Sequence, residues 1–289
     1  MIKDVDEVLS IFNDELRIAP GSQLKGVFDS RANNFKARLE SQKINLGAVT
    51  FNEVELDVKL LPLSDSVMNG RPVMELHSLA HFGSVVPKGR WSLSDVGVSI
   101  DGSTNALLFS TSWDNEELPL SKGSIIGDLQ FTKGKVNNEI VMKLQPTEIT
   151  LADTLWTISG GNKVRYNANF LGITGLNISN TIQEFKVDGS NSRDGDDGIK
   201  VALSNFEVAA FEPLIANDKL RVDGMVSGEA TIYGLFSKPY ATGNVQVKDL
   251  TLNEELLGDA SFNSSWKAGS ETVSVSGSIV KGTLEVFSV

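Results

Sequence analysis

The residues best suited to metal chemistry are two histidines four positions apart. His77 and His81 are the only histidines in the chain. On a helix such a pair shares one face and could bind zinc. Zinc proteases place a glutamate directly after the first histidine, but Ser78 stands there and no third ligand flanks the pair. Because the two histidines would also share a face on a strand, the sequence favours no metal site.

The segment from Asp188 to Gly198, DGSNSRDGDDG, is rich in oxygen donors. Calcium loops gather Asp and Asn around glycine in this way. The bidentate glutamate that closes an EF-hand loop is missing, and Lys200 stands near its place. We interpret the segment as a solvated hairpin loop, with weak calcium binding as the alternative.

Candidates for catalysis are few. The adjacent carboxylates Glu116-Glu117, Asp196-Asp197 and Glu254-Glu255 would point to opposite faces of a strand, so they cannot flank one glycosidic bond. Neither a nucleotide-binding glycine loop nor a GxSxG elbow is present. The absence of cysteine excludes thiol catalysis and disulfides. We therefore predict that the chain is not an enzyme and uses no cofactor.

Four tryptophans could line a sugar-binding face. Trp91, Trp113, Trp156 and Trp266 each lie in or beside an alternating run of apolar residues. Packing against a neighbouring strand is the interpretation we favour for all four.

The charge of the chain argues against anionic partners. The net charge is −11 and the pI about 4.8, with no clustered basic residues. Nucleic-acid binding requires such a cluster, so we expect no nucleic-acid partner. No stretch approaches the run of about 18 apolar residues needed for a membrane-spanning helix. The opening residues lack the pattern of a signal peptide, and we expect the chain to be an internal piece of a longer protein.

Most of the chain alternates apolar and polar residues with a period of two. Examples are Leu56-Val58-Leu60, Val96-Val98-Ile100, Ile199-Val201-Leu203 and Val273-Val275-Gly277-Ile279. This alternation is typical of strands with one apolar and one wetted face. Turn signals such as Asp101-Gly102 and Gly160-Gly161 separate the runs at hairpin spacing. The sequence predicts an all-β fold, an antiparallel meander of about 18 to 22 strands.

Residues 1–20 form the exception. Ile2, Val5, Leu9, Phe12 and Leu16 recur at helical spacing, and Pro20-Gly21 ends the segment. We expect a short amphipathic helix there. We also expect residues 62–72 to form a loop or crossover, because PLSDSVMNGRP has turn residues and no clear period.

Two distant segments resemble each other. Phe109 to Phe131 matches Phe262 to Val286, with Phe109 aligned to Phe262, Trp113 to Trp266, and Gly123 to Gly277. Long-range reuse of a strand–turn–strand unit is typical of arrays rather than of compact enzymes. On this repeat we divide the strands into two regions, 21–150 and 151–289, continuous in one elongated sheet.

Glycines and Asn-Phe pairs recur along the chain. Leu24 to Val58 carries a Gly-x-Phe-Asp-Ser opening from Gly26 and the pair Asn34-Phe35. Trp156 to Gly189 continues the pattern, followed by Asn205-Phe206, Gly224 with Gly228, Pro239, and Leu257-Gly258. This pattern resembles the TamB family of the translocation and assembly module, whose relatives are AsmA-like proteins.

The resemblance implies both a fold and a function. The fold would be a long antiparallel sheet curled into an open, U-shaped trough, or β-taco, with an apolar lining. The function would be movement of phospholipid acyl chains between the inner and outer membranes of a diderm bacterium, linked to outer-membrane protein assembly. The chain would then lie in the periplasm as part of a longer inner-membrane-anchored protein, with a β-barrel partner of the outer-membrane assembly type.

Apolar residues from the alternating runs are the candidates for the lipid-groove lining. A trough lined by such residues would lower the cost of removing acyl chains from a bilayer. The residues that we assign to the lining are Leu56, Val58, Leu60, Val164, Phe170, Val201, Leu203, Val222, Ile232, Val245, Val247, Val273, Val275 and Ile279.

Two other functions remain open from the residues. One is an extracellular or periplasmic glycan-binding or adhesion module, which would use the tryptophans and acidic loops. The other is a polysaccharide-processing enzyme on a β-solenoid, for which the sequence offers no cluster of catalytic residues.

Overall fold

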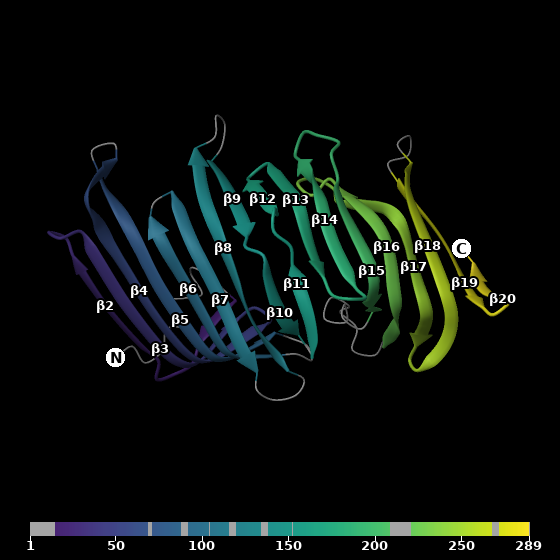
Figure 1. The fold of residues 1–289 in the computed structure, drawn as a ribbon, viewed down its shortest axis with the longest axis horizontal. Coiled ribbons are helices and arrows are strands. Elements are labelled where there is room, and N and C mark those ends of the chain that lie inside the picture. Colours follow the sequence, from purple (N-terminus) through teal and green to yellow (C-terminus); the bar gives the residue numbers. More distant parts are fainter. Residues whose placement is uncertain are drawn as a thin grey trace. The chain divides into compact units, whose positions relative to one another are not determined.

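The computed structural model describes residues 15–68, 71–87, 92–103, 105–115, 120–133, 138–151, 153–208, 221–267 and 272–288. These residues form an all-β fold of twenty strands in one antiparallel sheet, with no α-helix among them (Figure 1). The predicted all-β antiparallel class is therefore confirmed. The strands are β1 (Leu16–Ile18), β2 (Gln23–Asp29), β3 (Asn34–Leu46), β4 (Val49–Met68), β5 (Arg71–Pro87), β6 (Leu93–Ser103), β7 (Ala106–Asn115), β8 (Ser121–Lys133), β9 (Asn138–Leu144), β10 (Thr147–Leu151), β11 (Thr154–Ile158), β12 (Lys163–Asn167), β13 (Phe170–Ser179), β14 (Glu184–Ser192), β15 (Ile199–Glu207), β16 (Val222–Tyr233), β17 (Tyr240–Leu252), β18 (Glu255–Lys267), β19 (Thr272–Lys281) and β20 (Leu284–Ser288).

The chain divides into two compact units. The first comprises Met1–Thr132 and Thr147–Leu155, and the second comprises Lys133–Pro146 and Trp156–Val289. Strand β9 pairs with β12 in the second unit, whereas β10 returns to pair with β8 in the first. The boundary expected near residue 150 therefore falls inside β10.

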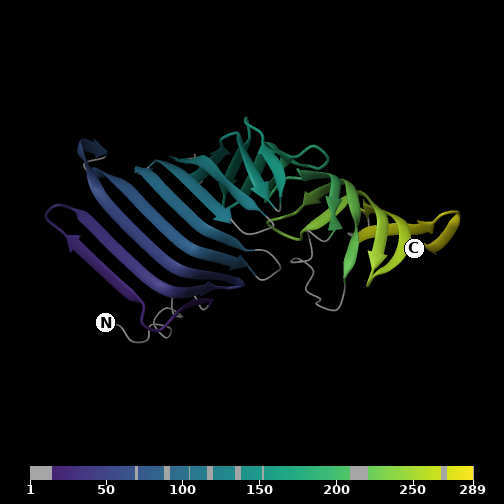
Figure 2. The ribbon, with the colours of Figure 1, turned by 60° about the horizontal axis from the view of Figure 1, so that its bottom comes forward.

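The first unit is a meander in chain order. Strands β2 to β8 pair each with the next (Figures 1 and 2), and β1 pairs with the end of β3 that follows the stretch paired with β2. Strand β4 pairs with β5 over most of its twenty residues, and this pair makes the longest ladder in the unit. Figure 2 shows β3 to β8 side by side as one broad layer.

The second unit is also a meander. Strands β12 to β20 pair in sequence, and β9 and β11 flank the start of the ladder by pairing with β12 and β13. Its buried centre is small and spans neighbouring strands: Val226, Val247 and Ala260 come from β16, β17 and β18.

The alternation of apolar residues slips by one position in five strands. In each, two apolar residues are three positions apart instead of two, and the second residue between them has a positive φ. At Gly175, Asn205 and Asp249 the pairing register also shifts, so the extra residue there is a β-bulge that bends the strand; at Glu53 and Asp95 the register is continuous. The steps are Phe51–Val54, Leu93–Val96, Ile173–Leu176, Leu203–Phe206 and Val247–Leu250, and the left-handed residues are Glu53, Asp95, Gly175, Asn205 and Asp249.

The slip keeps apolar side chains on one face across each bend. Leu250 packs against the buried cluster that contains Val247, although the two are three residues apart. In the first unit the ring of Phe51 contacts that of Phe82, at 5.1 Å between centroids, and Phe82 lies opposite Val54. Strict alternation would have turned one of each pair to the other face.

In three of these strands the bulge is held by a side chain of the next strand. The N–H groups of Gly175, Asn205 and Asp249 donate to Asp188 Oδ2 at 2.8 Å, Ser227 Oγ at 2.8 Å and Asp259 Oδ1 at 3.0 Å. An extra residue leaves its N–H outside the regular ladder, so a side-chain oxygen takes the place of the backbone acceptor.

Two expectations about secondary structure need correction. The helix expected over residues 1–20 is wrong at its end, because Leu16–Ile18 is strand β1, paired with Ile44–Leu46; residues 1–14 lie outside the described residues. The loop expected over residues 62–72 is instead the distal part of the β4–β5 hairpin, where Pro62 lies opposite Met74. A proline is tolerated there because this stretch carries a register shift.

The alignment of the two similar segments, Phe109 to Phe131 and Phe262 to Val286, also needs correction. Phe109 lies opposite Gly127, and Phe262 lies opposite Gly277. The two segments thus share a phenylalanine facing a glycine across a hairpin, but the matching of Gly123 with Gly277 is wrong, since Gly123 lies opposite Trp113.

The left-handed residues predict opposite effects for two neighbouring substitutions. Asp249→Val should lower the free energy of unfolding by about 1–2 kcal/mol, because a branched side chain is strained at positive φ. Lys248→Val, one residue earlier in the same strand, should be neutral or stabilising, since valine favours strands. Urea denaturation of both variants measures the difference. Equal destabilisation by the two would contradict the bulge.

Candidate functional site

The apolar face of the first unit is the first candidate surface. Directly opposed residues of adjacent strands lie on the same face, so the register defines rows that cross β3 to β8. Three such rows are almost wholly apolar, and they contain the predicted residues Leu56, Val58 and Leu60. The rows are Leu39-Leu56-Ala80-Val98-Thr111-Ile125, Ala37-Val58-Ser78-Ile100-Phe109-Gly127 and Phe35-Leu60-Leu76-Gly102-Leu107-Leu129.

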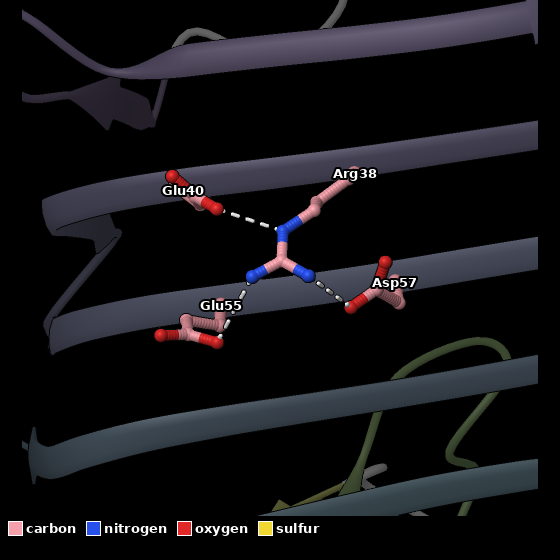
Figure 3. Close-up of polar contacts among 4 residues, drawn as sticks. All are labelled: Arg38, Glu40, Glu55 and Asp57. Carbon is pink, nitrogen blue, oxygen red and sulfur yellow. Dashed lines mark hydrogen bonds and ion pairs between the residues drawn. The ribbon is translucent and has the colours of Figure 1, made fainter.

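The reverse face of the same unit is polar. In Figure 3 the guanidinium of Arg38 lies between three carboxylates. Its Nε is 2.7 Å from Glu40 Oε1, and its two terminal nitrogens are 3.4 Å from Asp57 Oδ2 and 3.5 Å from Glu55 Oε2. These side chains are about half exposed, so the ion pairs contribute little stability individually. These charged groups show that the reverse face of the first unit is exposed to solvent.

The second unit repeats the division between faces. One row joins Phe185, Leu203, Gly228, Val245, Phe262 and Gly277, and another joins Phe206, Val226, Val247, Ala260, Ile279 and Phe287. The row on the reverse face is Lys186-Ala202-Glu229-Asn244-Asn263-Ser276.

Four of the predicted lining residues meet in one cluster. Val247 is buried beside Val226 and Ala260, and Leu203, Val245 and Ile279 pack against these three. Val201 and Ile232 lie on the same face, opposite Ala230 and Ile199.

The other predicted residues lie apart from this cluster. Val164 lies opposite Ile173, Val222 opposite Leu252 beyond a register shift, and Val273 opposite Trp266. Val275 is 57% exposed.

Phe170 is on the opposite face from Val164. It lies opposite Asn167 across the β12–β13 hairpin, and Arg165 stacks over its ring at 5.2 Å from the centroid. The prediction for Phe170 was wrong because the run Val164-Tyr166-Ala168-Phe170 extended the alternation through a turn. The chain reverses there, so odd and even positions no longer keep the same faces.

Neither apolar face is sealed. Most residues of the apolar rows are half-buried by their neighbours, and Phe35, Phe262 and Phe287 in these rows are exposed.

Sequence reasoning missed several residues of these faces. Phe51, Phe206 and Leu250 each stand at one end of a three-residue step. A search for apolar residues at every second position therefore did not include them. The signal was present as an Asp, Asn, Glu or Gly directly before the apolar residue that resumes the alternation.

The two histidines lie on the polar face of β5. His77 Nδ1 donates to Asp101 Oδ1 at 2.9 Å, and its Nε2 is 3.4 Å from Glu75 Oε2. His81 Nδ1 is 3.7 Å from Asp95 Oδ1. Within the described ranges no three His, Asp or Glu side chains are grouped so that they could hold a metal ion.

The acidic segment from Asp188 to Gly198 is anchored by an amide. Asn191 is fully buried; its Nδ2 donates to the carbonyl of Asp197, and its Oδ1 accepts from the N–H of Leu235. Asp188 Oδ2 is occupied by the N–H of Gly175. The hairpin loop expected over residues 188–198 is therefore partly strand, since Asp188–Ser192 belongs to β14; Asp188 holds the bulge of β13, and Asn191 ties the turn after β14 to the connection between β16 and β17.

Three of the four tryptophans can be placed. Trp113 is 6% exposed and lies opposite Gly123. Trp156 contacts Phe206 at 5.6 Å between ring centroids, and Trp266 stacks on Tyr240 at 4.2 Å. Trp91 lies outside the described residues. Trp113 and Trp266 pack against neighbouring strands, whereas Trp156 of β11 contacts Phe206 of β15, two strands beyond its pairing partner β13.

A shallow polar depression lies on the reverse face of the second unit. It measures about 430 Å³ and is lined only by polar residues and glycines of β16 and β17, including Glu229, Thr231, Thr242 and Asn244. The cross-strand pair Tyr233 and Tyr240 follows directly, with its rings stacked at 5.0 Å.

Comparison with protein-family models, with curated proteins and with solved structures gives no match for this chain. The likeness to the TamB family thus rests on the quoted residues. In the described part of the chain, no helix is long and apolar enough to cross a membrane.

The position of His77 predicts its titration. The hydrogen bond to Asp101, helped by Glu75, raises the pKa of His77 above its ordinary value. A raised pKa means that protonated His77 stabilises the fold at low pH, and that this contribution is lost as pH rises through the folded-state pKa. NMR titration should give a midpoint above 6.5, and Asp101→Asn should lower it. An unchanged midpoint in that variant would contradict the assignment.

Proposed function

We propose that this chain is a lipid-transfer protein whose apolar sheet faces hold phospholipid acyl chains. The observation that supports the proposal is that continuous apolar rows cross each unit and that no second layer of the described residues covers them. A soluble monomer normally exposes contiguous apolar patches of a few hundred Å² at most. A surface of this kind needs an occupant.

Acyl chains fit such a surface energetically. Moving a 16-carbon tail into water costs about 12 kcal/mol, at roughly 0.8 kcal/mol per methylene. A row of Leu, Ile, Val and Phe offsets this cost without a shaped pocket, so the binding would tolerate different lipids. The headgroups would stay in water, and no catalytic residue or cofactor is needed.

The bulges support a more specific shape. Five left-handed residues bend their strands while the apolar side chains stay on one face. We propose that each unit curls around its apolar face as an open, U-shaped trough. Bending toward the apolar side would bring rows from the same strands around one tail.

The location and partners follow from the resemblance to the TamB family. We propose that the chain belongs to a longer, inner-membrane-anchored periplasmic protein of a diderm bacterium. In that setting it would conduct phospholipid between the inner and outer membranes and work with a β-barrel of outer-membrane assembly.

A glycan-binding module is the second candidate. The polar depression beside Tyr233 and Tyr240 favours it, since hydroxyl, amide and aromatic groups together are typical of sugar sites. This depression is on the reverse face, so variants can separate the two functions.

Lipid binding can be tested on purified protein. Because the chain has no cysteine, a single cysteine at Val245 can carry an environment-sensitive fluorophore. Adding short-chain phospholipid should shift its emission to the blue as the label enters hydrocarbon. The same label at Asn244, the next residue on the reverse face, should not respond.

A second measurement does not depend on labelling. Organic extracts of the purified protein should contain phospholipid, and Val245→Asp should reduce it several-fold while Asn244→Asp leaves it unchanged. Circular dichroism confirms that both variants fold. Lipid-free protein together with an unresponsive label at Val245 would refute the proposal, and a response to oligosaccharides at Asn244 would favour the glycan module.

A further inference from the structure

The reverse face of the second unit differs from that of the first in its chemistry. In the first unit this face carries guanidinium, carboxylate and imidazole groups. Across β16 to β19, which lie side by side (Figure 1), it carries hydroxyl and amide groups in rows that the register defines. The rows are Ser227-Gln246-Ser261-Ser278 and Glu229-Asn244-Asn263-Ser276, with Thr231 opposite Thr242 and Ser265 opposite Ser274.

These rows carry almost no charge, although the chain is strongly acidic. The net charge is −11, and an exposed protein surface normally mixes Lys, Arg, Asp and Glu. The one carboxylate in the rows belongs to Glu229, and its Oε2 lies 2.6 Å from Lys200 Nζ of β15. The surface therefore presents no net charge to a ligand.

The amides of these rows are available to a ligand. Asn244, Gln246 and Asn263 are exposed, and within the described ranges none of their side chains is bonded to another protein group. An amide both donates and accepts hydrogen bonds, and so does the hydroxyl of serine or threonine. The rows can thus pair with a ligand whose own groups also donate and accept.

The polar depression lies within these rows. Its lining includes Thr231, Thr242, Asn244 and Gln246, and its volume of about 430 Å³ falls in the range of small-molecule sites, roughly 300–1,000 Å³. The rows continue past it over β18 and β19, so the polar surface extends about 14 Å across the strands at about 4.8 Å per strand. A surface of this length suits an extended ligand.

A stack of aromatic rings borders the depression. Tyr233 and Tyr240 lie two residues from Thr231 and Thr242, and therefore on the same face. Their rings stack at 5.0 Å, and Trp266, which is 36% exposed, stacks on Tyr240 at 4.2 Å. The face of an aromatic ring is electron-rich, so it attracts the C–H groups of a sugar ring, which carry partial positive charge.

We propose that this hydroxyl and amide surface of β16 to β19 binds an uncharged glycan chain, with one sugar ring against the aromatic stack. The inference rests on the second candidate function, glycan binding, and specifies its ligand. Sugar hydroxyls donate and accept, as the amides of the rows do. A polyanion would need basic residues, which the rows lack, and an acyl chain gains nothing from a polar surface.

Glycan binding and lipid binding would use opposite faces of the same strands. Asn244 lies on the reverse face, whereas its neighbour Val245 lies in an apolar row. Val245→Asp should therefore leave glycan affinity unchanged while it reduces bound lipid. Loss of either activity alone would leave the other proposal intact.

Calorimetric titration of the full chain with hexasaccharides tests the ligand class. The uncharged probes are cellohexaose, mannohexaose and N-acetylated chitohexaose; hexagalacturonate is the acidic probe and deacetylated chitohexaose the cationic one. At least one uncharged probe should bind more tightly than either charged probe. Tighter binding of a charged probe would overturn the inference but leave the glycan module standing, and no binding of any probe would overturn both.

Two substitutions on one face of β17 test the location. Asn244→Ala should weaken binding of the best uncharged probe about fivefold, the effect of one lost hydrogen bond. Lys248→Ala is the matched control, because Lys248 is exposed on the same strand but outside the rows, and it should leave the affinity unchanged. Circular dichroism confirms that both variants fold. Equal affinities of Asn244→Ala and the unaltered chain would overturn the proposed site.

Discussion

The structure depends on a left-handed residue placed where the apolar alternation must bend. A β-strand puts successive side chains on opposite faces of the sheet. A strand that bends sharply therefore needs an irregular residue at the bend if its apolar side chains are to stay on one face. At Glu53, Asp95, Gly175, Asn205 and Asp249 a residue with positive φ lies at the bend, and the apolar residues resume on the same side; at the last three it is an extra residue that shifts the register. Aspartate, asparagine and glycine tolerate this conformation better than the β-branched residues around them. The bulge N–H then needs an acceptor, which Asp188, Ser227 and Asp259 supply from the neighbouring strand.

The consequence is a sheet with two unlike faces in each unit. One face gathers Leu, Ile, Val and Phe into rows that cross six strands, and the other carries the charge pairs around Arg38 and the two histidines. In an ordinary sandwich a second layer would cover the apolar face. Here no second layer of the described residues covers it, so apolar area stays accessible on that face.

The period-two pattern alone determined the all-β class, the antiparallel meander and most members of the apolar rows, because alternation along one strand is a local property. Leu56, Val58, Leu60, Val245 and Val247 could be identified in this way. The register between strands required the tertiary structure, since a shift of one residue exchanges the faces, as Phe170 and the misaligned Gly277 illustrate. The bulges were likewise decided by pairing: an Asp or Asn between apolar residues looks like an ordinary polar position until the neighbouring strand shows which face its flanking residues occupy.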